Sequence, residues 1–235
     1  MLRRLVILGI VLVILVIAVI VGGDVIAEPM VERRIGEEIQ QRYELSKRPS
    51  VQINSFPFAV DGARGAIDHL EVTAENVAVE GLVLDRIDLD IYDLHYSLRE
   101  VLQDKETARA DRVDATARIS QAALNQYLVD QQLAYVVTLA EDRISVAGTV
   151  TVAGVDTQGA ASGELSIIDG AMRFRPIDVS VPGSSLDVPT LTAAIERLTF
   201  AVPIPDVVGV TLTAVDVAAG FATLDAEVID YQVMG

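Results

Sequence analysis

The feature that most restricts the fold of this chain is an alternation of apolar and polar side chains. It is clearest in LVLDRIDLDIYDLHY, residues 82–96, where Ile87, Leu89 and Ile91 are separated by charged or hydroxylated residues. Successive side chains of a β-strand point to opposite faces, so this period of two predicts a strand with one buried and one solvated face. Shorter stretches around Val51 and Val72 repeat the pattern.

Further strands are predicted along the second half of the chain. Residues 133–154, 159–181 and 209–233 are rich in valine, threonine and alanine, and Glu141-Asp142 and Asp169-Gly170 have the composition of hairpin turns. In ISVAGTVTVAG, residues 144–154, neither face carries a charge, which predicts a strand covered on both faces. Hydrophobic residues make up 51% of the chain but aromatic residues only 5%, a bias that favours strands of branched side chains.

Three helices are predicted between these strands. Val31, Ile35, Ile39 and Tyr43 recur every fourth residue within positions 29–45, as in an amphipathic helix. Ser120 is a suitable N-cap for a second helix, and residues 188–202 form an apolar stripe typical of a third. Helices interspersed among many strands predict a single α+β domain over residues 24–235.

Residues 1–23 form a separate segment. Leu5 to Gly22 lack any polar side chain, and as a helix they would be about 27 Å long, close to the thickness of a bilayer core. The apolar run of a cleaved signal peptide is shorter, about 7–15 residues, so we predict a membrane anchor and keep a signal segment as the alternative. Arg3 and Arg4 place the N-terminus in the cytoplasm and the C-terminal domain outside, as a single-pass cell-membrane protein.

Charge and composition exclude several classes of function. The chain carries a formal charge of −16, and because Arg3 and Arg4 are the only charges before Asp24, the remainder carries −18. Such a domain repels phosphate backbones, so no nucleic-acid partner is expected. The chain has no cysteine, which excludes disulfides, thiolate metal sites and cysteine nucleophiles.

No motif in the chain predicts catalysis, a cofactor or a metal. There is no nucleophile elbow of the G-x-S-x-G type and no phosphate-cradling glycine loop. The two histidines, His69 and His95, lack the spacing of a helical metal motif. The aspartates between Asp85 and Asp93 alternate with branched apolar residues, which favours a solvated strand face over a calcium loop.

Apart from catalytic and metal motifs, the remaining functional clue in the sequence is its apolar segments. Amphipathic helices, largely apolar strands and a membrane segment are compatible with a hydrophobic cavity or groove, and equally with a core filled by side chains. Periodicity alone does not distinguish these two possibilities.

Two motifs resemble the actinobacterial LmeA-like phospholipid-binding proteins, a family named for a lipomannan elongation factor. The first is the strand entry around SFPF and the glycine and strand that follow it. Its matching positions are Pro49, Val51, Ile53, Phe56, Pro57, Phe58, Gly65, Asp68, Glu71, Val72 and Val77. The second is the helix start ISQAALNQYL, which matches through Ile119, Ser120, Leu124, Asn125, Tyr127 and Leu128. The chain departs from the family pattern at Ser55, where glycine is usual, and at residues 59–64.

The resemblance implies a highly curved antiparallel sheet wrapped around a long helix, with additional short helices, as in tubular lipid-binding proteins. It also implies phospholipid binding at the outer face of the cytoplasmic membrane, as a carrier or chaperone in the assembly of envelope lipoglycans such as lipomannan. The missing catalytic motifs separately predict that the chain is not an enzyme. A structural or adaptor ectodomain that binds an envelope protein is the alternative, and a glycan-processing enzyme would need two converging carboxylates. We predict the following residues to line a lipid site: Phe56, Phe58, Leu124, Tyr127, Leu128, Phe174, Phe200 and Phe221.

Overall fold

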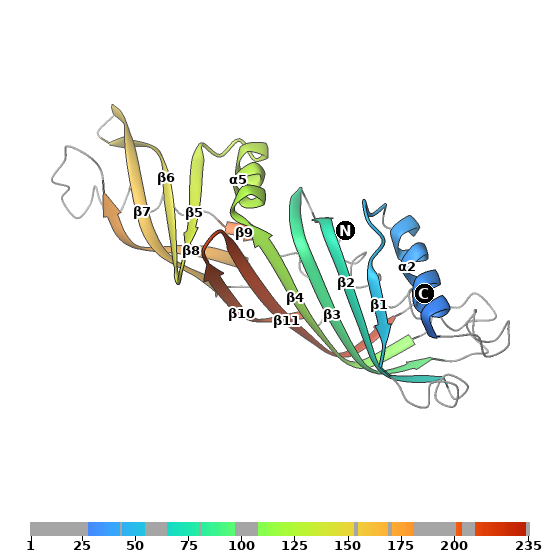
Figure 1. The fold of residues 1–235 in the computed structure, drawn as a ribbon. Coiled ribbons are helices and arrows are strands. Elements are labelled where there is room, and N and C mark those ends of the chain that lie inside the picture. Colours follow the sequence, from blue (N-terminus) through green and yellow to red (C-terminus); the bar gives the residue numbers. More distant parts are fainter. Residues whose placement is uncertain are drawn as a thin grey trace.

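A computed structural model describes residues 28–42, 44–54, 65–79, 81–96, 108–152, 155–168, 171–180, 201–203 and 210–233. Over these residues the chain forms two antiparallel sheets and two helices, α2 (Glu28–Arg42) and α5 (Gln121–Asp130). Figure 1 shows α2 beside one edge of the larger sheet and α5 between the two sheets.

The larger sheet has six strands in the order β1-β2-β3-β4-β11-β10. Their bounds are β1 (Ser50–Ile53), β2 (Ala66–Val79), β3 (Leu82–Tyr96), β4 (Ala108–Ser120), β10 (Val210–Ala218) and β11 (Phe221–Val233). β4 pairs with β11 over almost its whole length, from Phe221↔Ser120 to Val233↔Ala108. Two segments about a hundred residues apart in sequence are therefore neighbouring strands inside this sheet.

The smaller sheet has five strands in the order β5-β6-β7-β8-β9. Their bounds are β5 (Tyr135–Ala140), β6 (Arg143–Val152), β7 (Val155–Ile168), β8 (Ala171–Ser180) and β9 (Ala201–Pro203). Two backbone hydrogen bonds join the sheets at one corner. The Asp142 N–H donates to the Val217 carbonyl and the Gly220 N–H donates to the Leu139 carbonyl, both at 3.0 Å.

The six-stranded sheet has one apolar and one polar face. The face that we call the inner face presents buried side chains from five strands: Val51, Ile53, Leu70, Val72, Ile87, Leu89, Ile91, Val113, Leu224 and Val228. The opposite, outer face presents mainly charged side chains, among them His69, Glu71, Asp88, Asp90, Arg112 and Asp114. The alternation seen in the sequence therefore becomes a sheet with one buried and one solvated side.

Four neighbouring strands interrupt their alternation at the same level. Pairing skips Asp68 on β2, Asp93 on β3, Asp111 on β4 and Asp230 on β11, which together we call the aspartate row. Asp93 and Asp230 adopt left-handed backbone angles, with φ of 50° and 54°. Irregularities of this kind increase the local twist and bend of a strand, and here they fall in line across four neighbouring strands. Because each strand gains one outward residue, the apolar side chains beyond the row stay on the inner face.

Several sequence predictions are confirmed by these elements. β3 has the predicted limits of 82 and 96, α2 overlaps the first predicted helix over residues 29–42, and Ser120 caps α5. The turn at Glu141-Asp142 joins β5 to β6, and the pairing of Ile168 with Ala171 confirms the next hairpin.

Other sequence predictions were wrong or concern residues outside the described part of the chain. The strands form two sheets, where the sequence predicted one curved sheet, because β5 pairs with β6 and no strand of the larger sheet. In β6 the side chains of Ala147 and Thr149 are exposed while Ile144 and Val146 are buried, so cover on both faces was wrong for these residues. The third predicted helix falls mostly on residues outside the described part, and its last two positions belong to β9.

A long helix enclosed by the sheet is not among the described residues, whose helices have 15 and 10 residues. Nor does any helix in this part of the chain have the length and apolar character needed to cross a membrane. The apolar run from Leu5 to Gly22 lies outside the described residues.

Candidate functional site

The inner face has a strip of small side chains along its centre. Ala115 and Ala117 on β4 and Ala226 on β11 all point to this face, and Ala115 pairs directly with Ala226. All three are only partly buried, whereas Val113 on the same face is buried. We call these three residues the alanine strip. It is apolar surface that remains accessible in the middle of the larger sheet.

Larger apolar side chains border the alanine strip. The cross-strand register places Leu89 beside Ala115 and Ile87 beside Ala117 on one side. On the other side, Leu212 pairs with Ala226 and is partly buried. Short side chains flanked by long ones produce an apolar surface without a polar group along it, which suits an extended hydrocarbon chain.

The helix α5 closes one end of this region and is held by specific contacts. The Ser120 hydroxyl accepts a hydrogen bond from the Ala123 N–H at 3.2 Å, so it caps the helix. The Asn125 amide donates to the Val137 carbonyl at 2.8 Å and accepts from the Val137 N–H at 2.7 Å. Asn125 therefore bonds both backbone groups of Val137, as a residue of a neighbouring strand would. It ties α5 to β5 in this way. The second family motif thus consists of a cap, a bridge to the smaller sheet and core side chains.

The predicted lining residues lie in three different places. Leu124, Tyr127 and Leu128 share the buried side of α5 and join the main core. Phe174, only 1% exposed, lies on β8 in the smaller sheet. Phe221 is the first residue of β11, and the guanidinium carbon of Arg118 lies 3.8 Å from the centre of the Phe221 ring. Phe56, Phe58 and Phe200 are outside the described residues. The three α5 residues thus lie side by side, and Phe174 joins the same buried core from β8. A lipid contact for any of the eight stays a prediction.

The alanine strip was not predicted from the sequence. Alanines carry no pattern of their own, and their shared face becomes visible only once β4 and β11 are in register. The alternation in residues 108–120 predicts that Ala115 and Ala117 point to the same face of their strand. The sequence gives no other indication of the strip.

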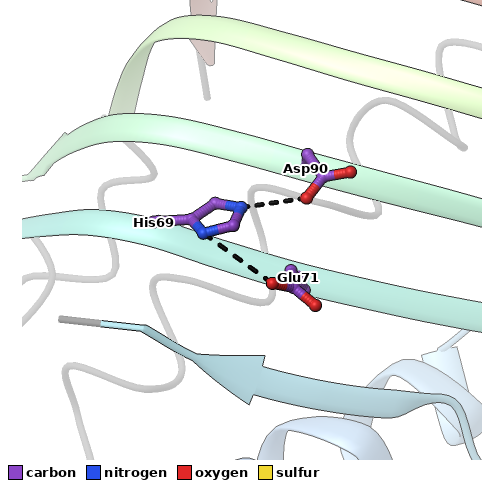
Figure 2. A group of neighbouring side chains, drawn as sticks. All are labelled: His69, Glu71 and Asp90. Carbon is purple, nitrogen blue, oxygen red and sulfur yellow. Dashed lines mark hydrogen bonds and ion pairs between the residues drawn. The ribbon is translucent and has the colours of Figure 1, made fainter.

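The outer face contains a compact polar cluster (Figure 2). His69 on β2 lies between two carboxylates: its Nε2 is 2.9 Å from Asp90 Oδ1, and its Nδ1 is 3.8 Å from Glu71 Oε1. The His69 ring stacks on Tyr92 with 4.7 Å between ring centres, and Arg112 lies 4.3 Å from the centre of the Tyr92 ring. Sequence spacing did not predict this group, because Asp90 is on the neighbouring strand.

Two carboxylates elsewhere on this face are held ionised by basic neighbours. The hydrogen bond from Arg86 lowers the pKa of Asp88 below its ordinary value, against an opposing effect of partial burial. The hydrogen bond from Lys47, at 2.7 Å, and its charge lower the pKa of Glu75. These ion pairs offset part of the negative charge on the outer face.

The described residues also contain a small surface pocket near the turn between β5 and β6. Its lining is mostly polar: Asp142, Arg143, Ser162, Gly163, Glu164, Ile177 and Asp178. A charged lining of this kind is a poor environment for an acyl chain.

A family model described as LmeA-like phospholipid-binding matches residues 22–227. The chain belongs to this family. The resemblance drawn from the two sequence motifs is therefore confirmed, and the match extends over both sheets and both helices. The family is a lipid-binding one. Comparison with the curated proteins and with the solved structures found no significant match.

Proposed function

We propose that this chain binds a phospholipid and that the acyl chain lies along the alanine strip on the inner face. The observation that carries the proposal is the partly exposed apolar surface formed by Ala115, Ala117 and Ala226 beside buried side chains of the same face such as Val113 and Leu224. Membership of a phospholipid-binding family supplies the class of ligand.

The energetics are adequate for such a site. Burial of an acyl chain contributes about 0.8 kcal/mol per methylene, so eight methylenes would contribute roughly 6 kcal/mol before the cost of ordering the chain and the protein is subtracted. The headgroup would stay at the margin of the sheet, because none of the described side chains along the strip is polar.

The charge distribution supports the same choice of face. The outer face places Glu71, Asp90, Asp114 and Glu227 in register across four strands. Anionic headgroups would be repelled by this arrangement. An apolar contact through the inner face avoids that repulsion.

Two further parts of the proposal concern location and pathway. We infer that residues 1–23 anchor the chain in the cytoplasmic membrane and that the described sheets lie outside it, on the basis of the apolar run from Leu5 to Gly22 preceded by Arg3 and Arg4. We also infer a non-enzymatic role as lipid carrier or chaperone in lipoglycan assembly, which rests on the family alone. Protease accessibility in intact cells tests the first, and the length of lipomannan in a deletion strain tests the second.

A pair of adjacent substitutions tests the lipid site itself. Ala115→Gln places an amide on the inner face, and Thr116→Gln places the same group on the outer face one residue away. Residues 24–235, purified without detergent, should retain phospholipid detectable by mass spectrometry. We expect Ala115→Gln to reduce the retained lipid several-fold, because its amide would be buried against the acyl chain without a partner, and Thr116→Gln to leave it unchanged. A lipid-free protein that also ignores added phospholipid vesicles would contradict the proposal.

A further inference from the structure

We propose that His69 and Glu71, with Asp90 as support, form a binding site for a divalent transition-metal ion of the Zn²⁺ type on the outer face. The three side chains each offer a ligand atom, and these atoms all lie within 4.8 Å of one another (Figure 2). One imidazole and carboxylate oxygens are a donor set that Zn²⁺ accepts. This inference is independent of the lipid site, which lies on the opposite face of the sheet.

The distances indicate which ring nitrogen would take the ion. Zn²⁺ lies about 2.0–2.2 Å from nitrogen and oxygen ligands, so two tetrahedral ligands are about 3.3 Å apart. The separation between His69 Nδ1 and Glu71 Oε1 is 3.8 Å, close to this value. On the other side of the ring, His69 Nε2 and Asp90 Oδ1 form a 2.9 Å hydrogen bond. We therefore place the ion at Nδ1 and Glu71, with Asp90 orienting the ring.

This arrangement matches the second shell of many metal sites. A ligating histidine usually donates its other ring N–H to a carboxylate, which fixes the ring and makes the ligating nitrogen more basic. Asp90 is already in that position. The ring is held further by its stacking on Tyr92, with 2° between the two ring planes.

The side chain of Asn54 offers a third metal ligand beside His69 Nδ1 and Glu71 Oε1. Its Nδ2 lies 2.5 Å from Glu71 Oε1 and 3.4 Å from His69 Nδ1. A half-turn of the amide would direct its oxygen, a metal ligand, to the position now taken by its nitrogen. Water would complete the coordination, because the His69 and Glu71 side chains are 24% and 43% exposed and an ion can reach them from solvent.

The surrounding charge favours a cation. Glu71 pairs with Asp90 across β2 and β3, and Asp90 pairs with Asp114 across β3 and β4. Like charges directly opposite each other destabilise a sheet, and a bound divalent ion would relieve that repulsion. The guanidinium of Arg112, which lies over Tyr92, pairs through its NH2 nitrogen with Asp114 Oδ2 at 3.3 Å, two strands away from Glu71.

The presence of only two histidines makes the test direct. Zn²⁺ is titrated into the full-length chain and followed by calorimetry and by ¹H–¹⁵N spectra of the imidazole nitrogens, with His95→Ala as the matched control. We expect the His69 resonances to shift at one equivalent, His69→Ala to weaken binding at least about tenfold, and His95→Ala to leave it unchanged. Asp90→Asn should weaken binding by about 10–100-fold, as second-shell changes do.

Three results would overturn the proposal. They are His69 resonances that do not move with Zn²⁺, an affinity that is the same in His69→Ala, and equal shifts of the His69 and His95 resonances. The spectra of the unaltered chain decide the matter even where a variant fails to fold.

Discussion

The pairing of β7 with β8 changes register between Ser162 and Gly163, so Gly163 is the first residue after the change. A Cβ added at this position would overlap the backbone oxygen and carbonyl carbon of Arg175. Since backbone atoms of a paired strand cannot move aside cheaply, glycine is required here for close approach of the two strands.

Replacement of this glycine should therefore destabilise the smaller sheet. We expect Gly163→Ala to lower the free energy of unfolding by about 1–3 kcal/mol, the usual cost of overpacking. Urea denaturation measures the change. Ser162→Ala, which adds no atom near Arg175, should stay within about 0.5 kcal/mol of the unaltered chain, and equal stabilities of the two variants would count against this account.

Lys47 controls the ionisation of Glu75 on the outer face. Its hydrogen bond and charge lower the pKa of Glu75 from the ordinary 4.5. A carboxyl group with a lowered pKa in the folded state contributes stability at pH values above 4.5, and this contribution is lost as the pH falls through the folded pKa. Both side chains are exposed, so the contribution itself is small.

The pKa shift can be measured even where the stability change is slight. In Lys47→Met, the pKa of Glu75 should rise toward its ordinary value, because both interactions with the ammonium are lost. An NMR titration of the side-chain carboxyl carbons reports the midpoint. Arg33→Met, which removes a partner of Glu37 instead, serves as the control. A Glu75 midpoint unmoved by Lys47→Met would show that the ion pair does not form in solution.

At the scale of elements, Asn125 is the connection on which the position of α5 depends. Its amide occupies both the N–H and the carbonyl of Val137. Loss of this side chain leaves two backbone groups of β5 without their partner, at a cost of roughly 1–3 kcal/mol each where water cannot replace it.

We expect Asn125→Ala to speed hydrogen exchange of the Val137 amide and to lower the free energy of unfolding by a few kcal/mol. Gln126→Ala removes the neighbouring amide, which donates to the exposed Asp130, and should change neither quantity measurably. Exchange of Val137 at the same rate in both variants would rule out the bridge.

Elements with a complete local pattern could be predicted from the sequence. The alternation over residues 82–96 gave both ends of β3, and Ser120 marked the start of α5. The aspartate row could not be predicted, because each strand shows only two adjacent outward residues, which resemble a local irregularity. Their alignment depends on the pairing of four strands. The same holds for His69 and Asp90, which are separated by 21 residues and meet through that pairing.

At the scale of the whole molecule, the sequence indicated an antiparallel α+β protein but not the division into two sheets. The choice of β11 as the partner of β4 joins residues 108–120 to residues 221–233. Such distant pairing is decided by tertiary packing and leaves no local sign. The family motifs carried the class of ligand, while the accessible apolar surface emerged only from the folded sheet.

Photo-crosslinking tests the central claim of a lipid site on the inner face most directly. The full-length chain would be reconstituted with a phospholipid that carries a diazirine in its acyl chain, irradiated and digested, and the labelled positions assigned by mass spectrometry. We predict labels on β4 and β11 at Ala115, Ala117 or Ala226, beyond any in the apolar segment of residues 5–22. Labels confined to that segment, or found on outer-face residues such as Thr116, would contradict the account.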